Sequence, residues 1–81
     1  MLTLGCAIYE EGCKNKPIDQ ATQIANWKQC GSICDRSNKE CNYWRYHIPT
    51  KECFLYVRCD PKKTDIRDIR GSSACFSGIK P

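Results

Sequence analysis

The cysteines are the residues of this sequence whose number and spacing most clearly indicate a chemical role. Eight of the 81 residues are cysteines. That density is typical of a disulfide scaffold, and an even count leaves no thiol over. Each bridge would stabilise so short a chain by about 2–4 kcal/mol, largely by restricting its unfolded state. We therefore predict four disulfide bonds among Cys6, Cys13, Cys30, Cys34, Cys41, Cys53, Cys59 and Cys75.

Two other uses of cysteine, a zinc site and a nucleophilic thiol, fit the pattern less well. Cys30, Cys34, Cys41 and His47 can be drawn as zinc ligands, but there is no Cys-x2-Cys pair and the cysteines outnumber the ligands of one tetrahedral site. A catalytic Cys–His pair needs a free thiol beside His47, and complete pairing leaves none. The adjacent acidic pair Glu10–Glu11 is interpreted as a solvated face. We expect no enzyme activity, no metal and no cofactor.

Basic side chains are a second group that could bind a ligand. Lys and Arg number 13 against 9 Asp and Glu, for a formal net charge of +4. They could bind a sulfated glycan through charge, and salt would then weaken the binding. Ordinary surface charge, partly neutralised by neighbouring aspartates, is the simpler alternative. The basic cluster comprises Arg58, Lys62, Lys63, Arg67 and Arg70, and the aspartates are Asp60, Asp65 and Asp68.

Aromatic residues form the third candidate group. Tyr43 has the opposite strand parity to Trp44 and Tyr46, so we expect Tyr43 to be the better exposed candidate. Phe54 and Tyr56 share a strand face with Arg58, which is either a ligand surface or a second packed face. The candidate ligand-binding residues are therefore Tyr43, Tyr56, Arg58, Lys62, Lys63 and Arg67.

One helix is needed to position these groups. Asn26 is a favourable N-cap, and Gln29 stands where it completes a capping box. The helical spacing of Trp27, Cys30 and Cys34 predicts a helix over 27–36 with these three side chains on one stripe. Trp27 is accordingly expected in the core.

A β-hairpin is predicted after the helix. Two runs rich in aromatic residues, 41–48 and 53–59, are separated by the polar turn 49–52. Cys53, Leu55, Val57 and Cys59 are expected to share one face of the second strand. Further short strands are predicted over 4–10, from Ile18 onward and over 72–77, with a turn at 11–17 and a charged loop at 60–70. The fold class is α+β, with one helix packed on an antiparallel sheet.

The chain is expected to form a single domain over 1–81, with its core between 6 and 75. Disulfide bonds persist in oxidising compartments, so we expect a secreted protein or the extracellular face of a cell. No apolar run is long enough to span a bilayer, and no signal peptide is visible, so the chain is interpreted as a processed piece without a transmembrane segment. Nucleic acid is not an expected partner in that setting.

A longer motif resembles the PAN/Apple domain family. It is a helix that carries two cysteines, then Cys-x-x-aromatic-x-Tyr, then Cys-aromatic-Leu. The cysteines near the two ends match a terminal pair found in many members, so the resemblance covers nearly the whole chain. The matching run is Cys30-x3-Cys34-x6-Cys41-x2-Trp44-x-Tyr46-x6-Cys53-x-Leu55, flanked by Cys6 and Cys75.

The resemblance implies a pairing that spacing alone leaves open: Cys6–Cys75, Cys30–Cys53 and Cys34–Cys41, with the additional Cys13 and Cys59 joined by elimination. That last bridge would bring Lys14 and Lys16 to the basic cluster. The family resemblance implies an extracellular recognition or adhesion module that binds a protein or carbohydrate, beside neighbouring domains of a parent protein. The alternatives are a free-standing secreted effector, such as a toxin or protease inhibitor, and a structural spacer.

Overall fold

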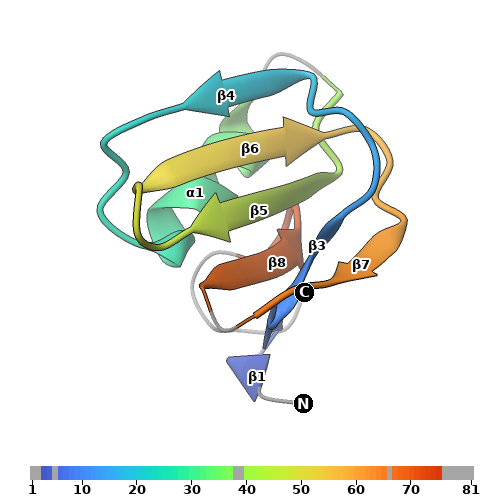
Figure 1. Cartoon of the computed structure of the whole chain (residues 1–81). Helices are drawn as coiled ribbons and strands as arrows, with labels where there is room; N and C mark the ends of the chain where they lie inside the picture. Colours follow the sequence, from blue (N-terminus) through green and yellow to red (C-terminus); the bar gives the residue numbers. More distant parts are fainter. Residues whose placement is uncertain (1–2, 5, 38–39, 66, 76–81) are drawn as a thin grey trace.

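One α-helix lies against a six-stranded antiparallel sheet, and a separate two-stranded ribbon lies on the other side of that sheet (Figure 1). The computed structural model describes residues 3–4, 6–37, 40–65 and 67–75. The sheet order is β1-β2-β8-β5-β6-β4, and the ribbon is β3-β7. The elements are β1 Thr3–Leu4, β2 Ala7–Tyr9, β3 Glu11–Cys13, β4 Asp19–Ala21, α1 Trp27–Arg36, β5 Tyr43–His47, β6 Glu52–Tyr56, β7 Pro61–Lys63 and β8 Asp68–Ser72.

The predicted helix is confirmed at both ends. The side chain of Asn26 accepts a hydrogen bond from the backbone N–H of Gln29 at 2.9 Å, as an N-cap does. The Gln29 side chain reaches back to the backbone N–H of Ala25 at 2.8 Å, one residue before the position that a standard capping box predicts. Cys30 and Cys34 face the sheet and are buried.

The predicted hairpin is confirmed as β5 and β6, whose register pairs Trp44 with Leu55 and Tyr46 with Cys53. Strand β6 ends at Tyr56, three residues earlier than predicted. Val57 is 39% exposed, so the expectation that it shares the buried face of Cys53 and Leu55 is wrong. The chain leaves the sheet there because the next residues cross to the β3-β7 ribbon, where Cys59 is bonded to Cys13.

The charged segment predicted as a loop over 60–70 instead supplies β7 and most of β8, a central strand between β2 and β5. The strand pattern of β8 is not apparent from the sequence, because its two faces do not alternate simply between apolar and polar residues. Asp68 and Arg70 occupy one face, while Ile69 and Gly71 form the other. Gly71 lies against Trp44, and a Cβ at position 71 would be 2.5 Å from the indole ring. Of the strand predicted over 72–77, Ser72 is the last residue of β8 and residues 73–75 lie beyond that strand. Residues 76–77 lie outside the described residues.

The N-terminal expectations also need correction. The single strand predicted over 4–10 is divided into β1 and β2, which pair with each other. The segment predicted as a turn over 11–17 contains β3. Glu10 joins β2 to β3 with φ of 67°, a left-handed conformation that redirects the chain out of the sheet. The extended piece predicted from Ile18 corresponds to β4.

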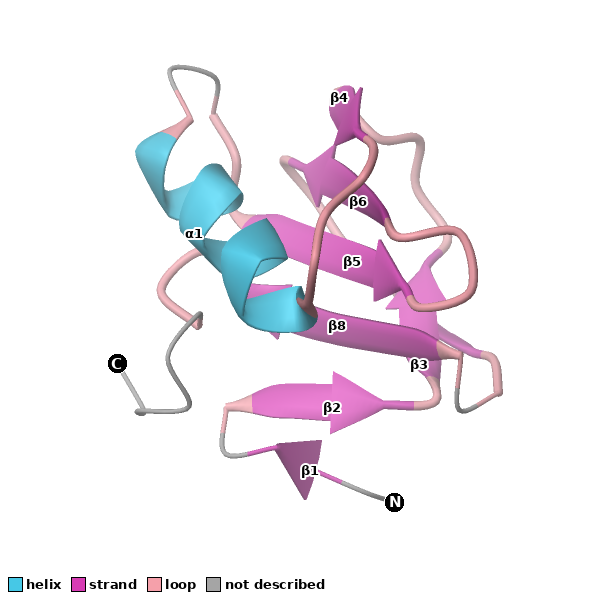
Figure 2. Cartoon of the chain, turned by 90° about the vertical axis from the view of Figure 1, so that its left-hand side faces the viewer, coloured by secondary structure: helices cyan, strands magenta, loops and turns pink. Residues whose placement is uncertain are grey.

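The main core lies between α1 and the sheet (Figure 2). Trp44 is fully buried there, and its ring stacks on that of Trp27 at 5.8 Å between centroids. The indole N–H of Trp44 is 2.8 Å from the carbonyl oxygen of Ser72 and 3.0 Å from that of Cys75, so it is not left unpaired. Tyr46 is buried beside it and donates to the carbonyl of Ile24 at 2.6 Å.

All four disulfide bonds are present, and their pairing is the one that the family resemblance implies: Cys6–Cys75, Cys13–Cys59, Cys30–Cys53 and Cys34–Cys41. Two of them attach α1, one to β6 and one to the segment before β5. Four bridges in so small a domain are typical of an oxidising environment. Among the described residues, no helix is long and apolar enough to cross a membrane.

Candidate ligand-binding surface

The ribbon covers part of the sheet face that is turned away from α1. Figure 2 places α1 and β3 on opposite sides of the sheet. Gly12, in the middle of β3, lies so close to β5 that a Cβ there would be 2.9 Å from Cδ of Arg45. The ribbon therefore packs on one part of this sheet face and leaves the neighbouring part uncovered. Polar side chains lie on both the covered and the uncovered part.

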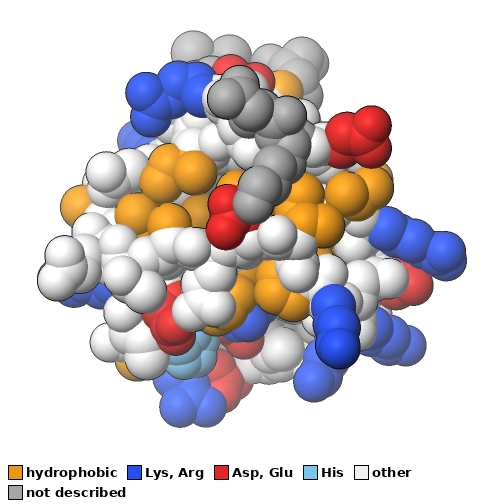
Figure 3. Space-filling model, turned by 90° about the horizontal axis from the view of Figure 1, so that it is seen from above, with side chains coloured by type: hydrophobic (Ala, Val, Ile, Leu, Met, Phe, Trp, Pro, Cys, Tyr) orange, Lys and Arg blue, Asp and Glu red, His pale blue; other side chains and the backbone are white. Residues whose placement is uncertain are grey.

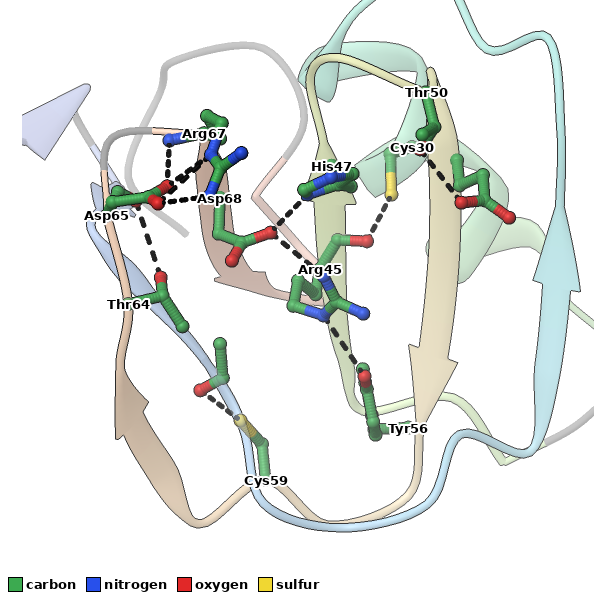
Figure 4. A network of polar contacts seen from close by, with 12 residues as sticks. Cys30, Arg45, His47, Thr50, Tyr56, Cys59, Thr64, Asp65, Arg67 and Asp68 are labelled. Atoms are coloured by element: carbon green, nitrogen blue, oxygen red, sulfur yellow. Dashed lines mark hydrogen bonds and ion pairs between the residues drawn. The ribbon is translucent and has the colours of Figure 1, made fainter.

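A polar network lies where the ribbon meets the sheet (Figure 4). Asp68, which is 7% exposed, accepts a hydrogen bond from Nη1 of Arg45 at 2.8 Å, and Nδ1 of His47 lies 2.9 Å from the same oxygen. Arg45 also donates from Nε to the Tyr56 hydroxyl at 3.3 Å and lies over the ring of Phe54, 4.1 Å from its centroid. These contacts connect β5, β6 and β8.

Arg45 is held firmly as a cation by this network. Burial by itself lowers the pKa of Arg45, but the hydrogen bonds and charges of Tyr56 and Asp68 outweigh it and raise that pKa above its ordinary value. Asp68 forms its ion pairs with Arg45 and His47 and not with a residue of the basic cluster, which it affects only through a weaker attraction to Arg67. The Asp68 carboxylate is buried and contacts Arg45 and His47.

The aromatic candidates Tyr56 and Tyr43 differ in exposure. Tyr56 is only 2% exposed and its hydroxyl is occupied by Arg45, so the surface role predicted for it is wrong. Tyr43 is half-buried on β5, with parity opposite to the buried Trp44 as expected. The face shared by Phe54 and Tyr56 is thus largely a second packed layer.

Three of the five clustered basic residues are already paired with carboxylates. Arg58 lies 3.3 Å from Asp60, Arg67 lies 2.6 Å from Asp65, and Arg70 lies 2.6 Å from Glu11. The hydrogen bond from the Arg67 side chain, aided by its backbone N–H, lowers the pKa of Asp65 to about 2. The Arg70–Glu11 pair is mostly buried, which corrects the expectation that Glu11 lies on a solvated face.

The remaining basic residues of this region lie on β7 and in the segment that follows β3. Antiparallel pairing sets Lys62 opposite Gly12 and Lys63 opposite Glu11, and the backbone N–H of Lys14 donates to the carbonyl of Asp60 at 2.9 Å. Lys14, Lys16, Lys62 and Lys63 are all exposed, and none of them forms an ion pair with another described residue. We use the name basic ribbon for Lys14, Lys16, Lys62 and Lys63.

The Cys13–Cys59 bridge joins the two parts of the basic ribbon, as the resemblance led us to expect. Asn15 strengthens this junction, because its side-chain oxygen accepts from the backbone N–H of Asp60 at 2.6 Å. Seen from above (Figure 3), Lys and Arg side chains project from the side where Figure 1 places β3 and β7.

Two hollows near the ribbon were not predicted. One, of about 290 Å³, is lined by Tyr9, Glu10, Glu11 and Lys63. The other, of about 170 Å³, lies under the ribbon and is lined by Gly12, Cys13, Arg45, Lys62, Thr64 and Asp68. Each combines segments about fifty residues apart in the chain, and no local sequence pattern signals such a meeting.

The chemistry of the surface is that of charge and hydrogen bonding. All eight cysteines are oxidised, so the thiols drawn earlier as zinc ligands or as a nucleophile beside His47 are disulfide sulfurs. Within the described ranges, no group of three or more His, Cys, Asp and Glu side chains has a geometry that could hold a metal ion.

No protein-family model matches the chain, and no curated protein matches its sequence.

Proposed function

We propose that this chain is an extracellular recognition module of the PAN/Apple type that binds a sulfated glycan through the basic ribbon. The observation that carries the proposal is the set of exposed lysines on β7 and in the segment that follows β3, which lack carboxylate partners among the described residues. Nearby Arg58 and Arg67 are each paired with an aspartate, so the unpaired positive charge in this part of the molecule lies on these lysines.

The form of the ribbon suits a linear polyanion. Lys62 and Lys63 are neighbours on β7, so their side chains project to opposite faces of the ribbon, and Lys14 follows the end of β3. Lysine ammonium groups are mobile point charges, which can follow sulfate groups spaced along a chain without a single rigid geometry. The formal net charge of +4 would add a weak long-range attraction.

The disulfide pattern supports the family part of the proposal. Two bridges attach the helix to the sheet region, and a third joins Cys6 to Cys75 near the two ends of the described chain. This arrangement is the one that the PAN/Apple resemblance implies, and its need for an oxidising compartment supports an extracellular location.

Retention on immobilised heparin tests the glycan proposal. The oxidised protein should bind, and increasing salt should release it, because exposed charge contacts are screened. The double variant Lys14→Glu/Lys62→Glu should weaken binding by about tenfold or more. Lys28→Glu is the matched single-site control, since Lys28 lies on α1, on the opposite side of the sheet.

Two results would contradict the proposal. The first is an absence of binding to any sulfated chain at low salt, which would leave an acidic protein as the leading partner. The second is a loss per reversed lysine that is as large for Lys28→Glu as for the ribbon variant, since binding would then follow net charge alone.

A further inference from the structure

We infer that the hollow beneath the β3-β7 ribbon is a binding site for a single phosphate group that carries a proton. Two cationic side chains and one carboxylate line this hollow, which is the combination that such a ligand requires. The site shares Lys62 with the basic ribbon, but it does not rest on the proposed function. The ribbon lysines would bind sulfate groups by charge alone, whereas this site needs a ligand that also donates a hydrogen bond.

The absence of a side chain at Gly12 leaves room between the ribbon and the sheet. A Cβ at this position would lie 2.9 Å from Cδ and 3.7 Å from Nε of Arg45, and 3.6 Å from Cγ2 of Thr64. Arg45 and Thr64 therefore border the space beside the glycine. The volume of about 170 Å³ is well below the roughly 300 Å³ at which sites for drug-sized ligands begin, so the hollow suits a small group.

The pairing of β3 with β7 directs Lys62 toward this space. Lys62 stands directly opposite Gly12 in the antiparallel register. Side chains at directly opposite positions project from the same face, so Lys62 leaves the ribbon on the face where a Cβ of residue 12 would meet Arg45. Lys63, the next residue of β7, projects from the other face. In agreement with this, Lys62 lines the hollow and Lys63 does not.

Arg45 supplies the second cation of the hollow. Its side chain is 21% exposed, and its Nε and Nη1 atoms donate to Tyr56 and Asp68. These bonds use two of the five guanidinium N–H groups, so three are left without a partner among the described residues. A hydrogen bond from such a cation to a phosphate oxygen is roughly twice as strong as one between neutral groups. Arg45 and Lys62 therefore favour an anion here.

Asp68 determines which anion is favoured. Its Oδ1 atom lies 2.8 Å from Nη1 of Arg45 and 2.9 Å from Nδ1 of His47, whereas no hydrogen bond joins its Oδ2 atom to another described residue (Figure 4). An ionised carboxylate only accepts hydrogen bonds, so it repels sulfate, which carries no proton near neutral pH. Hydrogen phosphate keeps an O–H that can donate to Oδ2, while its other oxygens accept from Lys62 and the Thr64 hydroxyl.

Titration of the oxidised protein with inorganic phosphate, followed by amide NMR spectra at about pH 6 and constant ionic strength, tests the site. Phosphate should bind with a Kd of about 1–10 mM and shift the amides of residues 12–13 and 62–64. Sulfate should bind at least about tenfold more weakly, because it leaves the carboxylate in the hollow without a donor. O-phosphoserine, which is still partly protonated at about pH 6, identifies the source: affinity equal to that of inorganic phosphate indicates a phosphate ester, and weaker binding indicates the free ion.

Two neighbouring lysines provide matched variants. Lys62→Met should weaken phosphate binding about fivefold or more, whereas Lys63→Met should change it by less than about twofold. Each removes one positive charge from an exposed residue of β7, so both should reduce heparin retention to a similar extent. Asp68→Asn should bring the affinities for phosphate and sulfate within about threefold of each other, because an amide can donate to either ion. The two ions and the lysine pair decide the question even where the Asn variant does not fold.

Three results would each overturn the inference. They are the absence of amide shifts with phosphate up to about 50 mM, equal affinities for phosphate and sulfate, and equal losses of phosphate affinity in Lys62→Met and Lys63→Met. Either of the last two would show that the lysines attract anions by charge alone. A protein that binds phosphate in this way but is not retained on heparin would contradict the proposed function and leave this site intact.

Discussion

The backbone of Gly71 lies closer to the indole ring of Trp44 than any residue with a side chain at position 71 would allow. A Cβ at position 71 would lie 2.5 Å from Cζ2 of the indole ring. The glycine thus lets the central strand β8 pass directly beneath the largest buried side chain of the core.

Gly71→Ala should therefore lower the free energy of unfolding by about 2 kcal/mol, the usual effect of overpacking a core. Urea unfolding of the oxidised protein measures it. Gly12→Ala is the comparison, because its Cβ would lie 2.9 Å from Cδ of the Arg45 side chain, a less close approach than that to the indole ring. A smaller loss is expected there, and an equal loss in the two variants would contradict the explanation.

The Cys13–Cys59 bridge should contribute more stability than the Cys34–Cys41 bridge. The first closes a loop of sequence separation 46 and the second one of 7. Chain entropy then predicts losses of about 4 and about 2 kcal/mol when each pair is replaced by serine. Thermal unfolding of the two double serine variants compares them. The reverse order would show that native contacts, rather than loop closure, dominate.

Removing the Cys13–Cys59 bridge should also weaken heparin binding by about threefold or more, because the two parts of the basic ribbon would no longer be joined covalently. The Cys34–Cys41 variant, measured at a temperature where both proteins are folded, should bind like the natural sequence. Equal affinity in all three proteins would contradict a role for the bridge in shaping the ribbon.

Asp65 should titrate with a pKa of about 2, because Arg67 donates to its carboxylate. The pKa is depressed in the folded state, so the pair contributes to stability above pH 3.8, the ordinary value, and that contribution is lost as the pH falls toward 2. Carboxyl NMR measures the titration. Arg67→Gln should raise the pKa of Asp65, and a value near 4 in the natural sequence would contradict the ion pair.

Tyr56 and Tyr43 should respond differently to loss of the hydroxyl group. Tyr56→Phe removes the acceptor for Nε of Arg45 in a buried network, with an expected loss of about 1–2 kcal/mol in unfolding free energy. Tyr43→Phe should change it by less than about 0.5 kcal/mol, since no hydrogen bond joins its hydroxyl to another described residue. Urea unfolding checks both, and equal effects would contradict the difference in their surroundings.

Local signals made the helix and the hairpin predictable. Asn26 caps the helix through a residue three positions away, and the alternation around Trp44 spans a single strand. The polar turn at 49–52 then brings two neighbouring strands together. Features of this kind depend on contacts within about ten residues, so their pattern is visible without knowledge of the fold.

Composition, periodicity and cysteine spacing are properties of the chain, so they were enough to predict a small α+β domain with fully paired cysteines. Folding in three dimensions placed β8 at the centre of the sheet and paired Arg70 with Glu11, 59 residues away. It also brought Tyr9 and Lys63 to one hollow and left the ribbon lysines unpaired. The physical reason is that a charge or an aromatic ring is buried, paired or available only according to its spatial neighbours, and most of those neighbours are distant in sequence.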